Sequence, residues 1–158
     1  MRDQLARSLD WGEAHAGFDK AVAGLAPELR GRRVQGLPHS AWELLEHLRI
    51  AQHDLLDFAT NAEYEAGSWP DDYWPSSPEP PSAKAWDESV AAFRRDRNAL
   101  KKLVRNGRIK LESRIPHAKK ASQTYLRDVL LVLDHNAYHV GELVALRQLL
   151  AAWPPKIE

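Results

Sequence analysis

The stretch Ser40-Ala41-Trp42-Glu43-Leu44-Leu45-Glu46-His47-Leu48 decides the fold class of this chain. Ser40 stands three residues before Glu43, which is the spacing of a capping box: each side chain hydrogen-bonds the backbone N–H of the other residue at the start of a helix. Apolar residues then recur at intervals of three and four as far as Ala59. The pattern predicts a helix from Ser40 to about Asn61.

Three other segments have helical periodicity. The first is predicted to run from about Asp3 to Leu25, on a stripe formed by Leu5, Leu9, Trp11, Phe18, Val22 and Leu25. The second runs from a capping Ser82 to about Asn106, with Gly107 as the terminating residue. The last starts near Ser122 or Thr124 and continues to about Trp153, before Pro154 and Pro155.

These helices account for most of a chain of 158 residues, which is the usual size of one domain. We find no sustained alternation of apolar and polar residues and no hairpin turn of the kind that strands require. The sequence therefore predicts an all-α protein, a four-helix bundle formed by a single domain over residues 1–158.

The connection between the second and third predicted helices is long and unusual. Five of the 19 residues at positions 63–81 are proline, which excludes a regular helix or a central strand. The same segment contains Tyr64, Trp69, Tyr73 and Trp74. We expect this crossover loop to pack against the helices, either as a functional cover or as a plain structural crossover, and its length permits the two helices to run parallel.

Composition excludes several classes of protein. The hydrophobic fraction is 44% and the charged fraction 28%, as in ordinary globular proteins. The chain has no cysteine, which rules out disulfides, thiolate metal sites and cysteine nucleophiles. No apolar run approaches the roughly 20 residues that span a bilayer, and the first residues do not open a signal peptide. We therefore expect a cytoplasmic protein without a membrane partner.

Basic residues are concentrated between Arg94 and Lys120, where 11 of them stand against two acids, although the whole chain has 22 of each sign. The stretch contains no interleaved aromatic residues and no motif that reads a nucleic-acid groove. We interpret it as a solvated helix face with cations near a helix C-terminus, and we do not expect nucleic acid as a partner.

The chain has seven histidines, and two of them lie in the sequence Asp134-His135-Asn136-Ala137-Tyr138-His139. Residues four apart on a helix lie one turn apart on nearly the same face, so the imidazoles of His135 and His139 can converge on one ion. Neutral imidazole suits zinc, nickel, copper and iron. Because this face also carries Leu131 and Val132, it is predicted to point inward, where the ring nitrogens need partners.

A third ligand has to come from another helix, and His47 is the best candidate because it shares a face with Leu44 and Ala51. His53 lies about 120° away around the same helix and cannot face the same ion. If His47 stood alone, we would interpret it as a core histidine bonded to a carbonyl group. Together with the inward-facing pair of His135 and His139, it predicts a site with three histidine ligands. Such a site keeps open positions for water or substrate, as catalytic sites do.

Other residues near the predicted site are less decisive. Asn136 stands where the zinc-protease helix motif has its glutamate base, which excludes that class. Glu142 could orient an imidazole, act as a catalytic base, or form an ion pair with Arg147 or another basic residue. Asp134 is rotated away from the site, and His15 could approach the cavity but is better explained as a packed, hydrogen-bonded histidine. We assign no role to the loop residues His39 and His117.

Three stretches resemble one known family. Residues 37–52, 69–75 and 134–147 are similar to the second helix, the loop and the last helix of the DinB-like superfamily of damage-inducible proteins. The resemblance implies a four-helix bundle with a divalent ion, often zinc or nickel, held by histidines at the positions of His47, His135 and His139. It also implies a homodimer and a small-molecule substrate, because relatives include enzymes that use a low-molecular-weight thiol as co-substrate.

These observations lead to two functional hypotheses. The first is a metal-dependent enzyme, either a hydrolase or a thiol-dependent transferase, in which Glu142 is the candidate catalytic residue. The alternative is a non-catalytic stress-response protein that binds a metal or another small ligand. Neither the substrate nor the metal follows from the sequence.

Overall fold

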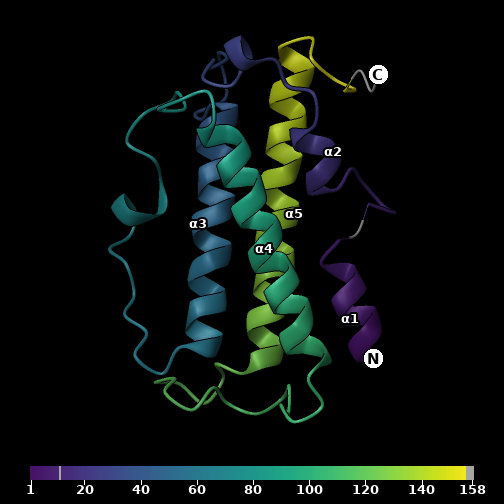
Figure 1. The fold of residues 1–158 in the computed structure, drawn as a ribbon, viewed down its shortest axis with the longest axis vertical. Coiled ribbons are helices and arrows are strands. Elements are labelled where there is room, and N and C mark those ends of the chain that lie inside the picture. The colour runs from purple at the N-terminus through teal and green to yellow at the C-terminus, as the bar shows by residue number, and fades with distance from the viewer. Residues whose placement is uncertain (11, 156–158) are drawn as a thin grey trace.

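The computed structural model describes residues 1–10 and 12–155. In this part of the chain there are five α-helices, two short 3-10 helices and no strand, so the all-α class is confirmed. The long helices α3 (Ala41–Thr60), α4 (Ala85–Arg105) and α5 (Tyr125–Leu149) pack along one another in a bundle (Figure 1). Two short helices, α1 (Arg2–Ser8) and α2 (Phe18–Val22), complete it.

Helix α3 begins as the sequence predicts. The backbone N–H of Glu43 donates to Ser40 Oγ at 3.2 Å, and the backbone N–H of Ser40 donates to Glu43 Oε2 at 2.8 Å, so the capping box is complete. The apolar stripe turns inward, with Leu45 and Leu48 fully buried in the main core between α2, α3, α4 and α5. This anchoring fixes the rotation of α3 about its axis, and with it the direction in which His47 points.

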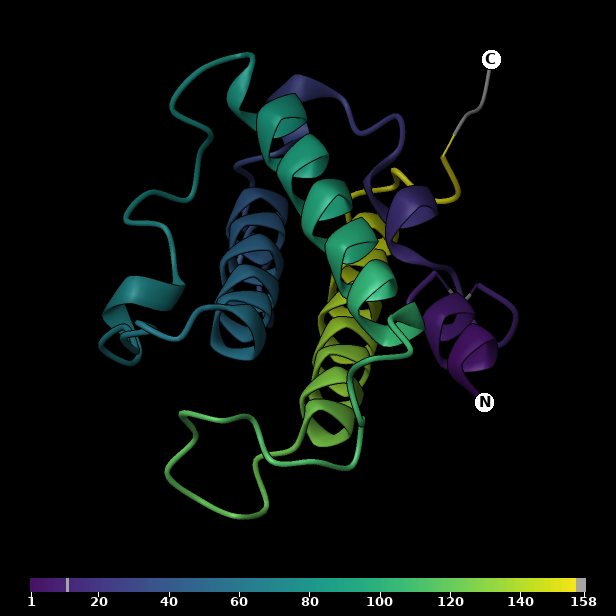
Figure 2. The ribbon, with the colours of Figure 1, turned by 60° about the horizontal axis from the view of Figure 1, so that its bottom comes forward.

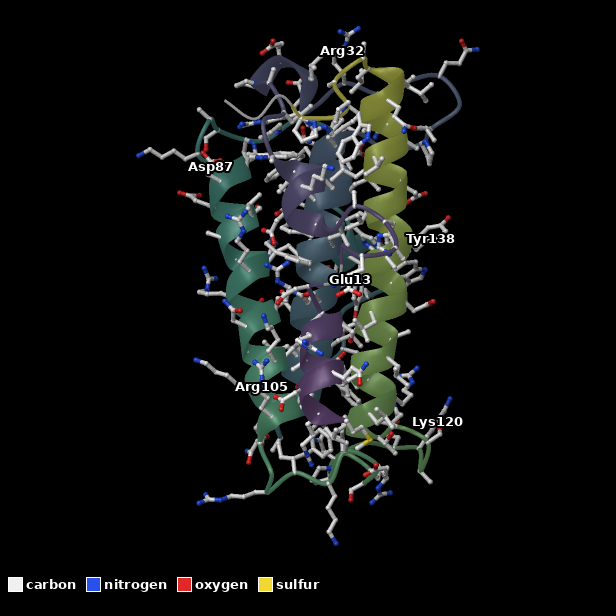
Figure 3. All side chains as sticks on the ribbon, turned by 90° about the vertical axis from the view of Figure 1, so that its right-hand side faces the viewer. Glu13, Arg32, Asp87, Arg105, Lys120 and Tyr138 are labelled. Atoms are coloured by element: carbon white, nitrogen blue, oxygen red, sulfur yellow. The ribbon has the colours of Figure 1, made fainter. Side chains whose placement is uncertain are left out.

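The single helix expected from Asp3 to Leu25 is wrong. The segment is divided into α1 and α2 by an irregular stretch that contains Gly12 and Gly17, two residues that weaken a helix by about 1 kcal/mol each. Gly17 is extended and forms the N-cap of α2. Figure 3 shows α1 and α2 one above the other between α4 and α5, so together they take the place of the fourth helix. Trp11, part of the predicted stripe, lies outside the described residues.

The start of α5 agrees with the prediction, whereas the start of α4 and the end of α5 differ from it by a few residues. Ser82 Oγ accepts the backbone N–H of Ala85 at 3.2 Å, but α4 starts only at that residue. Thr124 caps α5 through the N–H of Arg127, at 3.1 Å. Helix α5 ends at Leu149, ahead of the predicted Trp153, and the chain turns at Ala151, whose φ of 53° is left-handed.

The crossover loop, residues 63–81, has only one short 3-10 helix, Asp71–Tyr73. The loop returns the chain from the C-terminal end of α3 to the end of the bundle at which α3 begins, and α4 starts there. Helices α3 and α4 are therefore parallel, and α5 is antiparallel to both (Figure 1). The expected packing holds for Trp74, which is half-buried beside the core, whereas Trp69 is 70% exposed. This loop therefore covers one side of α3.

The basic stretch has a structural partner. Arg94 and Arg97 on α4 bind the carboxylate of Asp19 at 2.7 and 2.8 Å, and Lys101 pairs with Asp10. These ion pairs attach the first 20 residues to α4. The basic stretch is therefore more than the solvated helix face that the sequence predicts. None of the described helices is long and apolar enough to cross a membrane.

Candidate metal centre

The structure brings together the three histidines that the spacing selects. His47 comes from the middle of α3, and His135 and His139 come from the middle of α5, which runs antiparallel to it. The Nε2 atoms of His47 and His135 are 3.0 Å apart. One ring nitrogen from each of the three residues lies within 4.8 Å of the other two. In the described part of the chain, this is the one group of three or more such side chains that could hold a metal ion.

Hydrogen bonds fix which nitrogen of two rings is free. His47 Nδ1 lies 2.8 Å from the backbone oxygen of Tyr73, and because a carbonyl oxygen only accepts, Nδ1 carries the proton. His139 Nδ1 donates in the same way to Glu142 Oε2, at 2.6 Å. In both neutral rings the lone pair is therefore on Nε2. An acceptor that orients a histidine in this manner is the usual partner of a metal-binding imidazole.

The site keeps its imidazoles neutral. Burial lowers the pKa of His47 to about 4, although the hydrogen bond to Tyr73 acts in the opposite direction, and the neighbouring histidines lower it further. Burial and the nearby His135 and His39 lower the pKa of His139 to about 4 as well. The pKa of His135 is also lowered, mainly by burial. Near pH 7 all three rings are in the form that binds a metal.

The donor set fits a divalent ion. Two nitrogens that each lie about 2.0–2.1 Å from one tetrahedral zinc ion are roughly 3.3–3.4 Å apart. The Nε2 atoms of His47 and His135, 3.0 Å apart, lie close to this separation. Three neutral imidazoles suit zinc, nickel, copper or iron. Because closed structural zinc sites use four protein ligands, a set of three leaves room for water or a substrate.

Two aromatic residues of the crossover loop belong to the site, and sequence reasoning missed this role. The indole of Trp74 stacks on the ring of His47, with centroids 3.8 Å apart, and on the ring of His39, with centroids 3.9 Å apart. Trp69 approaches His47 edge-on at 6.3 Å. The many aromatic residues of this proline-rich loop were the one feature of the sequence that could have indicated this role. They did not indicate which histidine the loop contacts.

Glu142 lies beside His139, and the alternative of an ion pair with Arg147 is wrong. The guanidinium of Arg147 is fully buried and donates instead to the backbone oxygens of Ala21, Ala23 and Ala152, at 2.6–3.1 Å. It therefore anchors α2 to the end of α5. The structure shows Glu142 as an acceptor that orients His139, and its role as a catalytic base stays a prediction.

The remaining candidates lie away from the three imidazoles. His15 is exposed in the stretch between α1 and α2, where its one hydrogen bond to a described residue goes to the neighbouring Ala16 oxygen, so the packed histidine expected there is wrong. His53 is on a different face of α3 from His47 and pairs with Asp96 at 2.9 Å. Asn136 donates to Gln52 in the bundle interior, at 3.0 Å, and Asp134 is exposed.

Comparison with known proteins gives one match. A family model described as the DinB superfamily matches residues 11–143. No curated protein and no solved structure matches the chain. The matched segment includes all of α3, the whole crossover loop and α5 as far as residue 143, and so contains all three histidines.

Proposed function

Because this chain belongs to the DinB superfamily and joins three neutral imidazoles at one point, we propose that it is a metal-dependent enzyme acting on a small molecule. His47, His135 and His139 would hold a divalent ion, with zinc and nickel as the first candidates. When bound there, the ion would supply Lewis acidity and lower the pKa of a coordinated water or thiol.

The main support for this proposal is the orientation of the imidazole rings of His47 and His139. The Nδ1 atoms of His47 and His139 are both used by acceptors, Tyr73 and Glu142, so that both Nε2 lone pairs are available in the cluster. A core histidine bonded to a carbonyl would explain His47 alone, and a hydrogen bond between the Nε2 atoms of His47 and His135, at 3.0 Å, would explain that pair. Neither would explain the third imidazole, whose ring centroid is 4.5 Å from that of His47.

The roles of the chain's own residues follow from these contacts. Glu142 holds His139 in position and stabilises its Nδ1 proton, which makes Glu142 a positioning residue. Since the chain has no cysteine, a thiol nucleophile would have to be a small molecule that binds as co-substrate. A coordinated water would give a hydrolase, and a coordinated low-molecular-weight thiol would give a transferase.

The deciding experiment is metal stoichiometry on the untagged chain after reconstitution with zinc or nickel. We expect about one ion per chain for the wild type and loss of the ion for His47→Ala. His53→Ala is the matched control, because His53 lies on the same helix but on another face, and it should keep the ion. Equal metal content in the wild type and in His47→Ala would overturn the proposal.

Turnover then separates the two classes of function. The metal-loaded chain is assayed with activated esters and amides, and with an electrophile in the presence of low-molecular-weight thiols. Turnover that disappears in His47→Ala identifies the enzyme and its class. A chain that binds the ion but turns over none of these compounds would support the alternative, a non-catalytic metal-binding protein.

A further inference from the structure

A cavity of about 740 Å³ is lined by residues of α3, the crossover loop, the loop before α5 and the first turn of α5. Its volume is within the range of pockets that bind small organic molecules. Leu55 on α3 and Arg127 on α5 both line it. Each is eight residues from a predicted metal ligand, His47 or His135, which is about 12 Å along an α-helix. The cavity therefore uses the same two helices as the metal centre but is a separate site.

The cavity is bounded by segments that are distant in sequence. Figure 2, in which this end of the bundle comes forward, shows the loop between α4 and α5 and the start of the crossover loop near the ends of α3 and α5. Phe58 on α3 makes edge-to-face contacts with Tyr64 of the crossover loop and with His117 of the other loop, at 5.2 and 5.4 Å between centroids. These rings, together with Leu55, give the cavity an apolar and aromatic lining.

Charged residues of both signs also line this cavity. Lys119 and Arg127 come from the loop before α5 and from its first turn, and Asp54 and Glu65 come from α3 and the crossover loop. Among the described residues none of these four forms an ion pair, although the cations of α4 are largely paired. Asp54 accepts a hydrogen bond from the Tyr64 hydroxyl at 2.7 Å, which holds its carboxylate at the cavity.

The lining thus contains two cations, two acids and an aromatic surface, and among the described residues no cation there forms an ion pair with an acid. A ligand with a single charge would be attracted by the groups of one sign and repelled by those of the other. A ligand with both charges can be attracted by both. We propose that this cavity binds a small zwitterion with an apolar body, an amino-acid-like molecule whose carboxylate faces Lys119 and Arg127 and whose ammonium group faces Asp54 and Glu65.

The test uses the full chain and L-phenylalanine as the probe, with binding measured by titration calorimetry and by NMR chemical-shift changes. We expect saturable binding that weakens at least tenfold in Arg127→Gln and in Asp54→Asn, because each removes one charge that faces the ligand. Arg108→Gln and Asp71→Asn, at exposed positions outside the cavity, are the matched controls and should bind as the wild type does.

Two analogues test the need for both charges. N-acetyl-L-phenylalanine has lost the cation and phenethylamine has lost the carboxylate, and each should bind at least tenfold more weakly than phenylalanine. The proposal is overturned if phenylalanine gives no saturable signal at millimolar concentration, if either analogue binds as well, or if the Arg127 and Asp54 variants bind unchanged. Metal-free His47→Ala should still bind phenylalanine, so this outcome is independent of the proposed metal chemistry.

Discussion

The imidazole of His47 and the indole of Trp74 lie parallel, with an interplanar angle of 1° and ring centroids 3.8 Å apart. The residue before Trp74 holds the same imidazole in a second way, because the Tyr73 oxygen accepts the Nδ1 proton at 2.8 Å. Two consecutive residues of the crossover loop therefore fix the plane of one ring and its tautomer. The loop is part of the candidate metal centre as well as a connection between helices.

Removing the Trp74 ring should weaken metal binding without removing a ligand. In Trp74→Ala the His47 ring loses its stacking surface and gains freedom to rotate, and we expect the affinity for zinc to fall about tenfold, as it does when residues that orient metal ligands are lost. Trp74→Phe keeps an aromatic surface and should lose less. Competition with a chromophoric chelator measures both affinities.

Trp69→Ala is the control for this prediction. Trp69 belongs to the same loop and is 70% exposed, and it touches His47 only edge-on at 6.3 Å. Its loss should change the affinity less than the loss of Trp74. Equal affinities in the wild type and in Trp74→Ala would show that the stacking does not position His47.

The contact between Glu142 and His139 gives a second prediction. Glu142→Ala removes the acceptor of the Nδ1 proton, so zinc affinity should fall between about tenfold and a hundredfold. Glu142→Gln keeps an acceptor oxygen without the charge, and its affinity should lie between those of the wild type and Glu142→Ala. Chelator competition is again the measurement. Asp134→Ala, at an exposed acid of the same helix, should lower the affinity less than Glu142→Ala does, and an equal loss there would point to a general charge effect.

Much of the fold could be predicted because its signals are local. The capping box of Ser40 and Glu43 needs only a spacing of three, and the structure contains both of its hydrogen bonds. The break between α1 and α2 was missed because apolar spacing continues across Gly12 and Gly17, and in this segment the weak helix propensity of glycine outweighs the periodicity.

The candidate metal centre also has a part that could be predicted from local sequence patterns and a part that could not. His135 and His139 could be paired from sequence because four residues make about one helical turn, and His47 followed from the inward faces of two helices. The contacts of Tyr73, Trp74 and His39 could not be predicted. They depend on how a loop without periodic pattern docks onto α3, which long-range packing decides.

The lowered pKa values of the site histidines predict how the metal-free protein responds to acid. His47 and His139 have a pKa of about 4 when folded and 6.5 as the reference value, so between these pH values the unfolded chain binds more protons than the folded one. The free energy of unfolding should therefore decrease as the pH falls from 6.5 to 4, by roughly 2 kcal/mol for each histidine.

Urea unfolding of the metal-free chain at a series of pH values measures this slope. In His139→Gln, which cannot be protonated at this position, the slope should be smaller. The exposed His53→Gln is the control and should leave it nearly unchanged. A slope that His139→Gln does not reduce would mean that the site histidine does not account for the loss of stability in acid.

Asp128 gives the opposite dependence on pH. Its side chain is 1% exposed, and neither carboxylate oxygen accepts a hydrogen bond from a described residue. Burial raises its pKa from 3.8 to about 7, and the nearby Asp54 adds to this, whereas Arg127 acts against it. Between pH 4 and pH 7 the folded chain holds a proton that the unfolded chain has released, so this residue makes the free energy of unfolding fall as the pH rises.

Replacing Asp128 with asparagine removes the cost of a buried charge. We expect Asp128→Asn to raise the free energy of unfolding at pH 8 by on the order of 2 kcal/mol, and to change it little at pH 4, where the folded wild type is already neutral at this position. Urea unfolding at the two pH values measures the difference. Asp71→Asn removes an exposed charge and should leave the stability nearly unchanged at both. If Asp128→Asn destabilises the chain at pH 8, the carboxylate must be charged and bound by a partner in the folded protein.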